Sequence, residues 1–159
     1  MVNEIMKTKY LLMAAMMLLG TMCFTACGDD DDDDVEKAIE NFENGKLKPT
    51  VTYKEGKDQL TLTADYKGVM TENHVAKFDA AGKLTSYIFS VTYASDKLAD
   101  EAWKESQADP DDDVKFERNG RTITADYTSM YKDYFTYDMM KQFFQRLKTE
   151  LESGEMIIK

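Results

Sequence analysis

This sequence is poor in the residues that most catalytic centres and metal sites require. Its 159 residues include one histidine, two cysteines and two prolines, and 20 Lys+Arg are outnumbered by 30 Asp+Glu, for a formal net charge of -10. One imidazole cannot build a multi-histidine metal centre. An excess of carboxylates disfavours nucleic-acid binding, because phosphates need neutralisation by Lys and Arg. We therefore expect no nucleic-acid partner, no resident metal and no cofactor.

The N-terminus has the three-part pattern of a secretory signal peptide. Lys7 and Lys9 form a short positive region, and an apolar stretch follows over residues 10–26. That stretch is at the lower limit for a membrane-spanning helix, and aspartates follow it instead of a basic stop-transfer cluster. The pattern therefore predicts a cleaved signal, for which both Met1 and Met6 are candidate start residues.

The apolar stretch ends in Phe24-Thr25-Ala26-Cys27, which resembles the lipobox of bacterial lipoproteins. In that family, small residues precede a cysteine whose thiol is acylated before the chain is cleaved on its N-terminal side. Phe24 replaces the usual leucine, and the other three positions match. The resemblance implies that Cys27 becomes a lipidated N-terminus, with palmitate-type chains that anchor it to a membrane. Cys23 is then lost with the signal, so the mature chain keeps no thiol for a disulfide.

A run of six aspartates follows the lipobox: Asp29, Asp30, Asp31, Asp32, Asp33 and Asp34. A block of like charges repels itself, which predicts an extended, solvated tether. The run has no preformed cage for calcium. Its position after the cysteine resembles the surface-export signal of Bacteroidetes lipoproteins, which implies display on the outer face of the outer membrane. The alternative is an anchor that faces the periplasm.

These features divide the chain into a signal peptide (1–26), a lipidated cysteine with an acidic tether (27–34) and one globular domain (35–159). The globular segment is long enough to bury a single sizeable core. Because it holds no cysteine, its stability must come from packing.

Hydrophobic periodicity predicts the elements of the globular domain. Leu60, Leu62, Ala64 and Tyr66 alternate with polar residues, which is typical of a half-buried strand, and Asn119-Gly120 is a strong hairpin signal. Helices are predicted at 35–43, 96–107 and 137–153, and strands at 51–53, 60–66, 72–78, 84–93, 114–118 and 121–127, with a short terminal strand at 155–159. The order α-ββββ-α-ββ-α indicates an α+β fold, an antiparallel sheet with helices packed on one face.

This order of elements resembles the small YehR-like envelope lipoproteins. The shared features are the lipobox, the hairpin region, a helix that begins with residues 96–102, a second hairpin and an aromatic C-terminal helix. That family has no assigned activity, so the resemblance implies an architecture and no chemistry.

Candidate catalytic and metal-binding residues are few. His74 lies in a predicted strand, and no G-x-S-x-G motif or mature cysteine accompanies it, so we interpret it as an ordinary strand residue. A loop carries aspartates at the spacing of a calcium site, Asp109, Asp111 and Asp113. Val114 and Gly120 stand where an EF-hand needs Gly and Glu, which favours a solvated acidic loop.

Aromatic residues gather between the last hairpin and the last helix: Tyr127, Tyr131, Tyr134, Phe135 and Tyr137. Tyrosines are flat and amphipathic, so they suit a surface that binds protein or carbohydrate. Core packing is the alternative. It is favoured for Phe135, whereas Tyr131 and Tyr134 fit either interpretation.

Three functions are compatible with these observations. The leading hypothesis is an outer-membrane-anchored, surface-exposed lipoprotein whose domain is a non-enzymatic binding or assembly module for a protein or glycan partner. The second is a carboxylate-based glycan hydrolase, which needs two facing carboxylates about 5–9.5 Å apart. The third is an inhibitor or lectin-like module that uses the Tyr131–Tyr137 region.

Overall fold

The computed structural model describes residues 32–108 and 113–154. The predicted order of elements is confirmed, with one short helix, α4, added before the last. The elements are α2 (Asp32–Glu43), β1 (Thr50–Glu55), β2 (Gln59–Tyr66), β3 (Met70–Phe78), β4 (Leu84–Tyr93), α3 (Asp96–Ala108), β5 (Lys115–Asn119), β6 (Thr122–Asp126), α4 (Thr128–Tyr131) and α5 (Tyr137–Ser153).

The strands form one six-stranded antiparallel sheet in the order β1-β2-β3-β4-β6-β5. The first four strands follow one another as hairpins, and the β5–β6 hairpin then joins the sheet through β6. Its turn contains Gly120 with φ 58°, a left-handed conformation that Asn-Gly turns supply at little steric cost. The hairpin predicted from this dipeptide is therefore confirmed.

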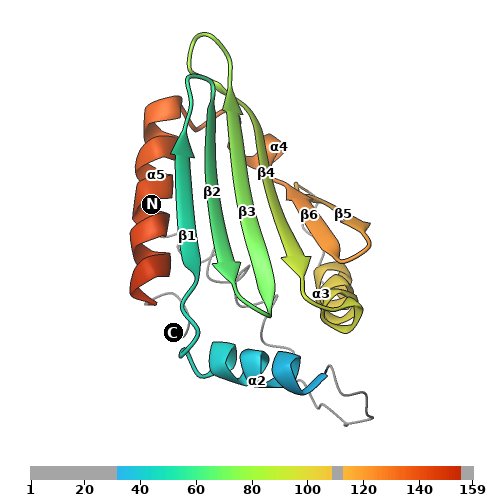
Figure 1. The fold of residues 1–159 in the computed structure, drawn as a ribbon. Coiled ribbons are helices and arrows are strands. Elements are labelled where there is room, and N and C mark those ends of the chain that lie inside the picture. The colour runs from blue at the N-terminus through green and yellow to red at the C-terminus, as the bar shows by residue number, and fades with distance from the viewer. Residues whose placement is uncertain (1–31, 109–112, 155–159) are drawn as a thin grey trace.

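The core lies between the sheet and the helices on one of its faces. Figure 1 shows α5 running beside β1, with α4 behind β4 and α3 near the β6 end of the sheet. Every second residue of β2 is buried, as the alternation predicts, and four residues of α5 pack over the same face: Met140, Phe144, Leu147 and Leu151. Each such side chain contributes about 1.5–3 kcal/mol when fully buried.

Helix α2 begins earlier than the sequence predicts. The acidic tether was expected to stay extended through Asp34, but Asp32–Asp34 form the first turn of α2. The predicted strand at 155–159 lies outside the described residues. No helix in the described part of the chain is long and apolar enough to cross a membrane.

Both ends of α5 are fixed by local signals. The Thr136 side chain accepts a hydrogen bond from the Met139 backbone N–H at 3.4 Å, a typical N-cap. At the other end Gly154 has φ 77°, and its N–H bonds back to the last turn, as expected of a C-terminal glycine. These caps define where the helix starts and stops over β1 and β2.

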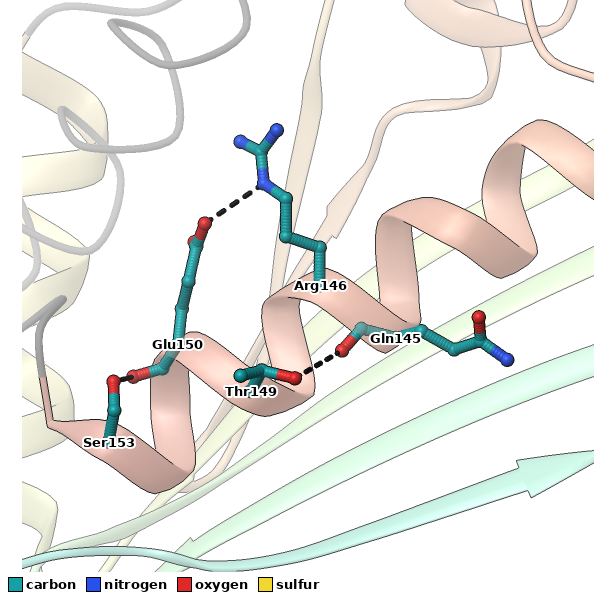
Figure 2. A network of polar contacts seen from close by, with 5 residues as sticks. All are labelled: Gln145, Arg146, Thr149, Glu150 and Ser153. Atoms are coloured by element: carbon teal, nitrogen blue, oxygen red, sulfur yellow. Dashed lines mark hydrogen bonds and ion pairs between the residues drawn. The ribbon is translucent and has the colours of Figure 1, made fainter.

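The outer face of α5 is polar, and its side chains form hydrogen bonds and an ion pair with other groups of the same helix, as Figure 2 shows. Arg146 Nε lies 2.9 Å from Glu150 Oε1, Thr149 donates a hydrogen bond to the Gln145 carbonyl at 3.1 Å, and Ser153 donates one to the Glu150 carbonyl at 2.9 Å. An exposed pair of this kind contributes only about 0.3–0.5 kcal/mol. This face is thus suitable for control substitutions.

Candidate functional site

The residues predicted to anchor and export the protein are mostly beyond the described ranges. Cys27 and Asp29–Asp31 lie outside them, whereas Asp32–Asp34 belong to α2. In the acidic loop, Asp113 is described and exposed, and residues 109–112 are not described. Within 32–108 and 113–154, no group of three His, Cys, Asp or Glu side chains could hold a metal ion.

The tyrosines of the predicted binding surface divide between core and solvent. Tyr127 and Tyr131 are only 5% and 8% exposed, whereas Tyr134 is 70% exposed. Tyr137 is half-buried, and its hydroxyl donates a hydrogen bond to the Gly56 carbonyl at 2.6 Å. Phe135 is buried, as core packing predicts. One tyrosine of the four, Tyr134, therefore remains available to a ligand.

Helix α4 explains why Tyr127 and Tyr131 point inward. The Tyr127 N–H donates to the Tyr87 carbonyl at 2.9 Å, which ties the start of α4 to β4. One helical turn then places Tyr131 on the same side, and both rings lie about 6 Å from the Tyr87 ring. The sequence shows no strong periodicity over so short a helix, so this inward orientation was not predicted.

His74 lies in β3, the strand predicted for it, and its side chain is part of the core. It is 6% exposed, and its ring centroid lies 4.6 Å from that of Phe89 and 5.9 Å from that of Phe144. Its Nδ1 shares a hydrogen bond of 2.9 Å with the Tyr87 hydroxyl. Burial lowers the pKa of His74 to about 3, so the imidazole is neutral near pH 7 and has its polar partner inside the core.

Glu72 is a second ionisable residue on the side of β3 that faces the core, the side on which His74 lies. It was not among the candidate residues singled out from the sequence. It lies two residues before His74, beside Ala64 of β2 and Val91 of β4. Its side chain is half-buried, and burial raises its pKa to about 7. Such a carboxyl exchanges its proton near neutral pH, which suits a general acid or base.

Two tyrosines surround this carboxyl. Burial, and secondarily the charge of Glu72, raises the pKa of both Tyr66 and Tyr93, and Glu105 of α3 adds to the effect at Tyr93. A signal for this cluster existed in the sequence. Once β3 begins at Met70, strand alternation places Glu72 on the buried face. The strand predicted from the sequence begins at Glu72, and the alternation of buried and exposed side chains was not extended to this first residue.

The opposite side of the sheet carries no helix of the described residues, and we call it the open face. One row of side chains crosses it through all six strands: Thr52, Thr63, Asn73, Ser90, Thr124 and Glu117. Each lies opposite the next in the register, and they are half-buried or exposed. The open face is thus a polar surface rich in hydroxyl groups.

Hydrogen bonds between neighbouring strands order these hydroxyl groups. Thr63 donates to Asn73 Oδ1 at 2.6 Å, and Thr92 Oγ1 lies 2.9 Å from Thr122 Oγ1. At the centre of the face, Val75 of β3 pairs with Ile88 of β4. The result is a regular array of donors, acceptors and methyl groups.

The charges of the open face are balanced between the two signs. Three lysines project from it, Lys54, Lys77 and Lys115, and three acidic residues offset them, Asp65, Glu117 and Asp126. No aromatic residue, methionine or arginine projects from the paired strands on this side. Its chemistry is therefore that of neutral hydrogen bonding.

Comparison with known proteins adds no relative, because no family model, curated protein or solved structure matches this chain.

Proposed function

We propose that this protein is a lipoprotein of the outer membrane, anchored through Cys27 and displayed outside the cell, and that its domain is a non-enzymatic binding module. The open face of the sheet is the observation that carries the binding proposal. Helices α3, α4 and α5 contact strands from the other side of the sheet, and α2 lies beyond its end. Among the described residues, this leaves an ordered polar surface without a covering element. The lipobox and the aspartate run supply the anchor and the export signal.

The ligand that best fits the open face is a neutral glycan. Strands lie about 4.8 Å apart, and residues on one face recur at about 6.6 Å along a strand. The hydroxyl and methyl groups of Thr therefore form a regular grid that offers polar and apolar contacts to the hydroxyl and C–H groups of a sugar polymer. The balanced charges favour an uncharged polymer over an acidic one. Many anchored copies that meet one polymer would add avidity to weak single contacts.

A protein partner fits this face less well. Stable protein interfaces are centred on aromatic residues, methionine or arginine in desolvated pockets. The open face has none of these residues, and its apolar centre consists of Val75 and Ile88, both half-buried. The face therefore lacks the anchors that supply most of the energy at a protein interface.

The anchor is tested by fractionating cells that express the full chain. We expect the protein in the membrane pellet and labelled by added palmitate, and we expect Cys27→Ala to abolish the labelling and to leave the signal uncleaved. Cys23→Ala is the matched control, because it changes the other cysteine and leaves the lipobox intact. Palmitate labelling of the Cys27→Ala variant, or a natural chain in the soluble fraction, would contradict the anchor.

The binding module is tested by electrophoresis of the full chain through gels that contain starch, a neutral β-glucan or, for comparison, pectate. We expect at least one neutral polymer to retard the protein. Thr124→Lys adds a charge within the hydroxyl row of the open face and should abolish the retardation. Thr149→Lys makes the same change on the outer face of α5 and should preserve it. Equal behaviour of the two variants, or no retardation by any neutral polymer, would refute the glycan proposal.

A further inference from the structure

The middle of the open face places a polar pair of side chains next to an apolar pair. Asn73 of β3 lies opposite Ser90 of β4. One step along the same two strands on this face, Val75 lies opposite Ile88. All four side chains are half-buried, and we call them the Asn73 patch. Val75 and Ile88 are the only apolar side chains that the six strands direct to the open face.

The amide of Asn73 is oriented by its neighbour on β2. The Thr63 hydroxyl donates a hydrogen bond of 2.6 Å to Asn73 Oδ1, so the amide oxygen is already engaged. The Nδ2 group has no hydrogen-bond partner within residues 32–108 and 113–154, and the same holds for the Ser90 hydroxyl. Asn73 therefore offers two N–H donors to a ligand, whereas Ser90 can donate or accept.

The spacing within the Asn73 patch suits a small functional group. Opposed residues of an antiparallel pair have Cβ atoms about 4.5–5.5 Å apart, and residues on one face of a strand recur at about 6.6 Å. The patch is thus a rectangle with polar groups along one side and aliphatic groups along the other. A group that is polar at one end and apolar at the other satisfies both sides.

We infer that the Asn73 patch binds the acetamido group of an N-acetylated sugar, an inference that rests on the proposed function and narrows its ligand. The carbonyl oxygen of the acetamido group accepts from Asn73 Nδ2, and its N–H donates to the Ser90 hydroxyl. Its methyl group packs on Val75 and Ile88. The group carries no charge, in keeping with the balanced charges of the open face. The ring hydroxyls then lie over the neighbouring hydroxyl side chains, such as Thr124.

Other ligand groups would leave part of the patch unsatisfied. A sugar hydroxyl over Val75 and Ile88 would lose hydrogen bonds to water without replacing them. A purely aliphatic group would cover that pair but would remove water from the Asn73 amide, which costs free energy when no new bond forms. A carboxylate would use the amide donors, but it has no methyl group for the aliphatic side and no arginine on this face to neutralise it.

The test is isothermal titration calorimetry of the full chain, kept soluble in a detergent without a sugar headgroup, with chitohexaose and cellohexaose. The two hexasaccharides share length and linkage, and they differ only in the acetamido groups that replace hydroxyls in chitohexaose. We expect chitohexaose to bind roughly tenfold more tightly, because it adds a hydrogen bond and a buried methyl group.

The outcomes separate this inference from the proposed function. Equal affinities, or tighter binding of cellohexaose, would overturn the inference and leave the neutral-glycan proposal standing. Retardation of the chain by a neutral polymer in the gel, with no binding of either hexasaccharide, would do the same. Failure of both assays would overturn the binding of glycans and the inference together.

Two substitutions in the patch test its two sides. Asn73→Asp keeps an acceptor for the Thr63 hydroxyl but removes the N–H donors, and it should bring the two affinities together. Val75→Thr exchanges a methyl group for a hydroxyl on a side chain that still favours a strand, and it should lower the ratio of the affinities several-fold. Gln145→Glu is the matched control, because it makes the same amide-to-carboxylate change on the outer face of α5, and it should leave the ratio unchanged. Circular dichroism checks that each variant is folded, and a folded variant at either patch position that keeps the natural ratio would contradict the inference.

Discussion

Two ionisable residues on one strand give this core opposite responses to pH. The pKa of Glu72 is raised from 4.5 to about 7, and that of His74 is lowered from 6.5 to about 3. Between about pH 4.5 and 7 the folded state holds the Glu72 proton more tightly than the unfolded state, so Glu72 makes stability fall as pH rises. Between about pH 3 and 6.5 the unfolded state binds the His74 proton more tightly, so His74 makes stability rise with pH.

We predict that these two contributions largely cancel between pH 4.5 and 6.5. Each has a limiting slope of about 1.4 kcal/mol per pH unit. Glu72→Gln should therefore expose the His74 slope, and the free energy of unfolding should rise by about 1–2 kcal/mol from pH 5 to pH 6.5. Urea denaturation across that range measures the slope.

His74→Gln provides the complementary control. It keeps a polar group that can bond to the Tyr87 hydroxyl, and it removes the proton that His74 binds. The remaining Glu72 contribution should then make stability fall from pH 5 to pH 7. Slopes of the same sign in both variants would contradict the assignment of the two shifts.

The tyrosines of the α4 region differ sharply in their predicted effect on stability. Tyr131 is 8% exposed and contacts Tyr87, Tyr127 and Phe135, so Tyr131→Ala should cost about 3 kcal/mol through the cavity that it leaves. Tyr134 is 70% exposed, and Tyr134→Ala should change stability by less than about 0.5 kcal/mol. Thermal denaturation of the two variants checks this. Similar losses would mean that Tyr134 also packs into the core.

At the scale of elements, the sequence predicted what local patterns determine. The alternation in β2 and the Asn119-Gly120 turn are carried by adjacent residues, and both are confirmed. Helix α4 was missed because four residues cannot display a helical period. The start of α2 was missed because a run of like charges predicts an extended segment, and the helix nevertheless includes Asp32–Asp34.

The N-cap of α5 leads to a prediction about a whole element. Thr136→Ala removes the acceptor for the Met139 N–H and should lower stability by about 1 kcal/mol. Thr149→Ala, on the outer face of the same helix, removes only a bond to the Gln145 carbonyl. It should be nearly neutral, because alanine favours the helix. Urea unfolding of both variants gives the difference, and an equal loss would show that the cap does not hold the helix start.

At the scale of the molecule, the candidate surfaces could not have been read from the sequence. The row on the open face joins Thr52 of β1 to Glu117 of β5 through four intervening strands, and such rows exist only once strand order and register are known. The Asn73 patch is likewise a property of strand register. The proposed anchor is the reverse case, because the lipobox-like motif is continuous in sequence and needs no tertiary structure.

The aspartate run supports a prediction about the whole protein in its envelope. If Asp29–Asp34 direct display outside the cell, replacing all six with asparagine should leave the Cys27 anchor intact and trap the protein inside. Protease added to intact cells should then digest most of the natural chain and little of the asparagine variant, while both stay in the membrane pellet. Replacement by six glutamates is the matched control, because it keeps the negative charge of the run. It should restore digestion. If the asparagine variant were digested as readily as the natural chain, the run would be a spacer and not an export signal.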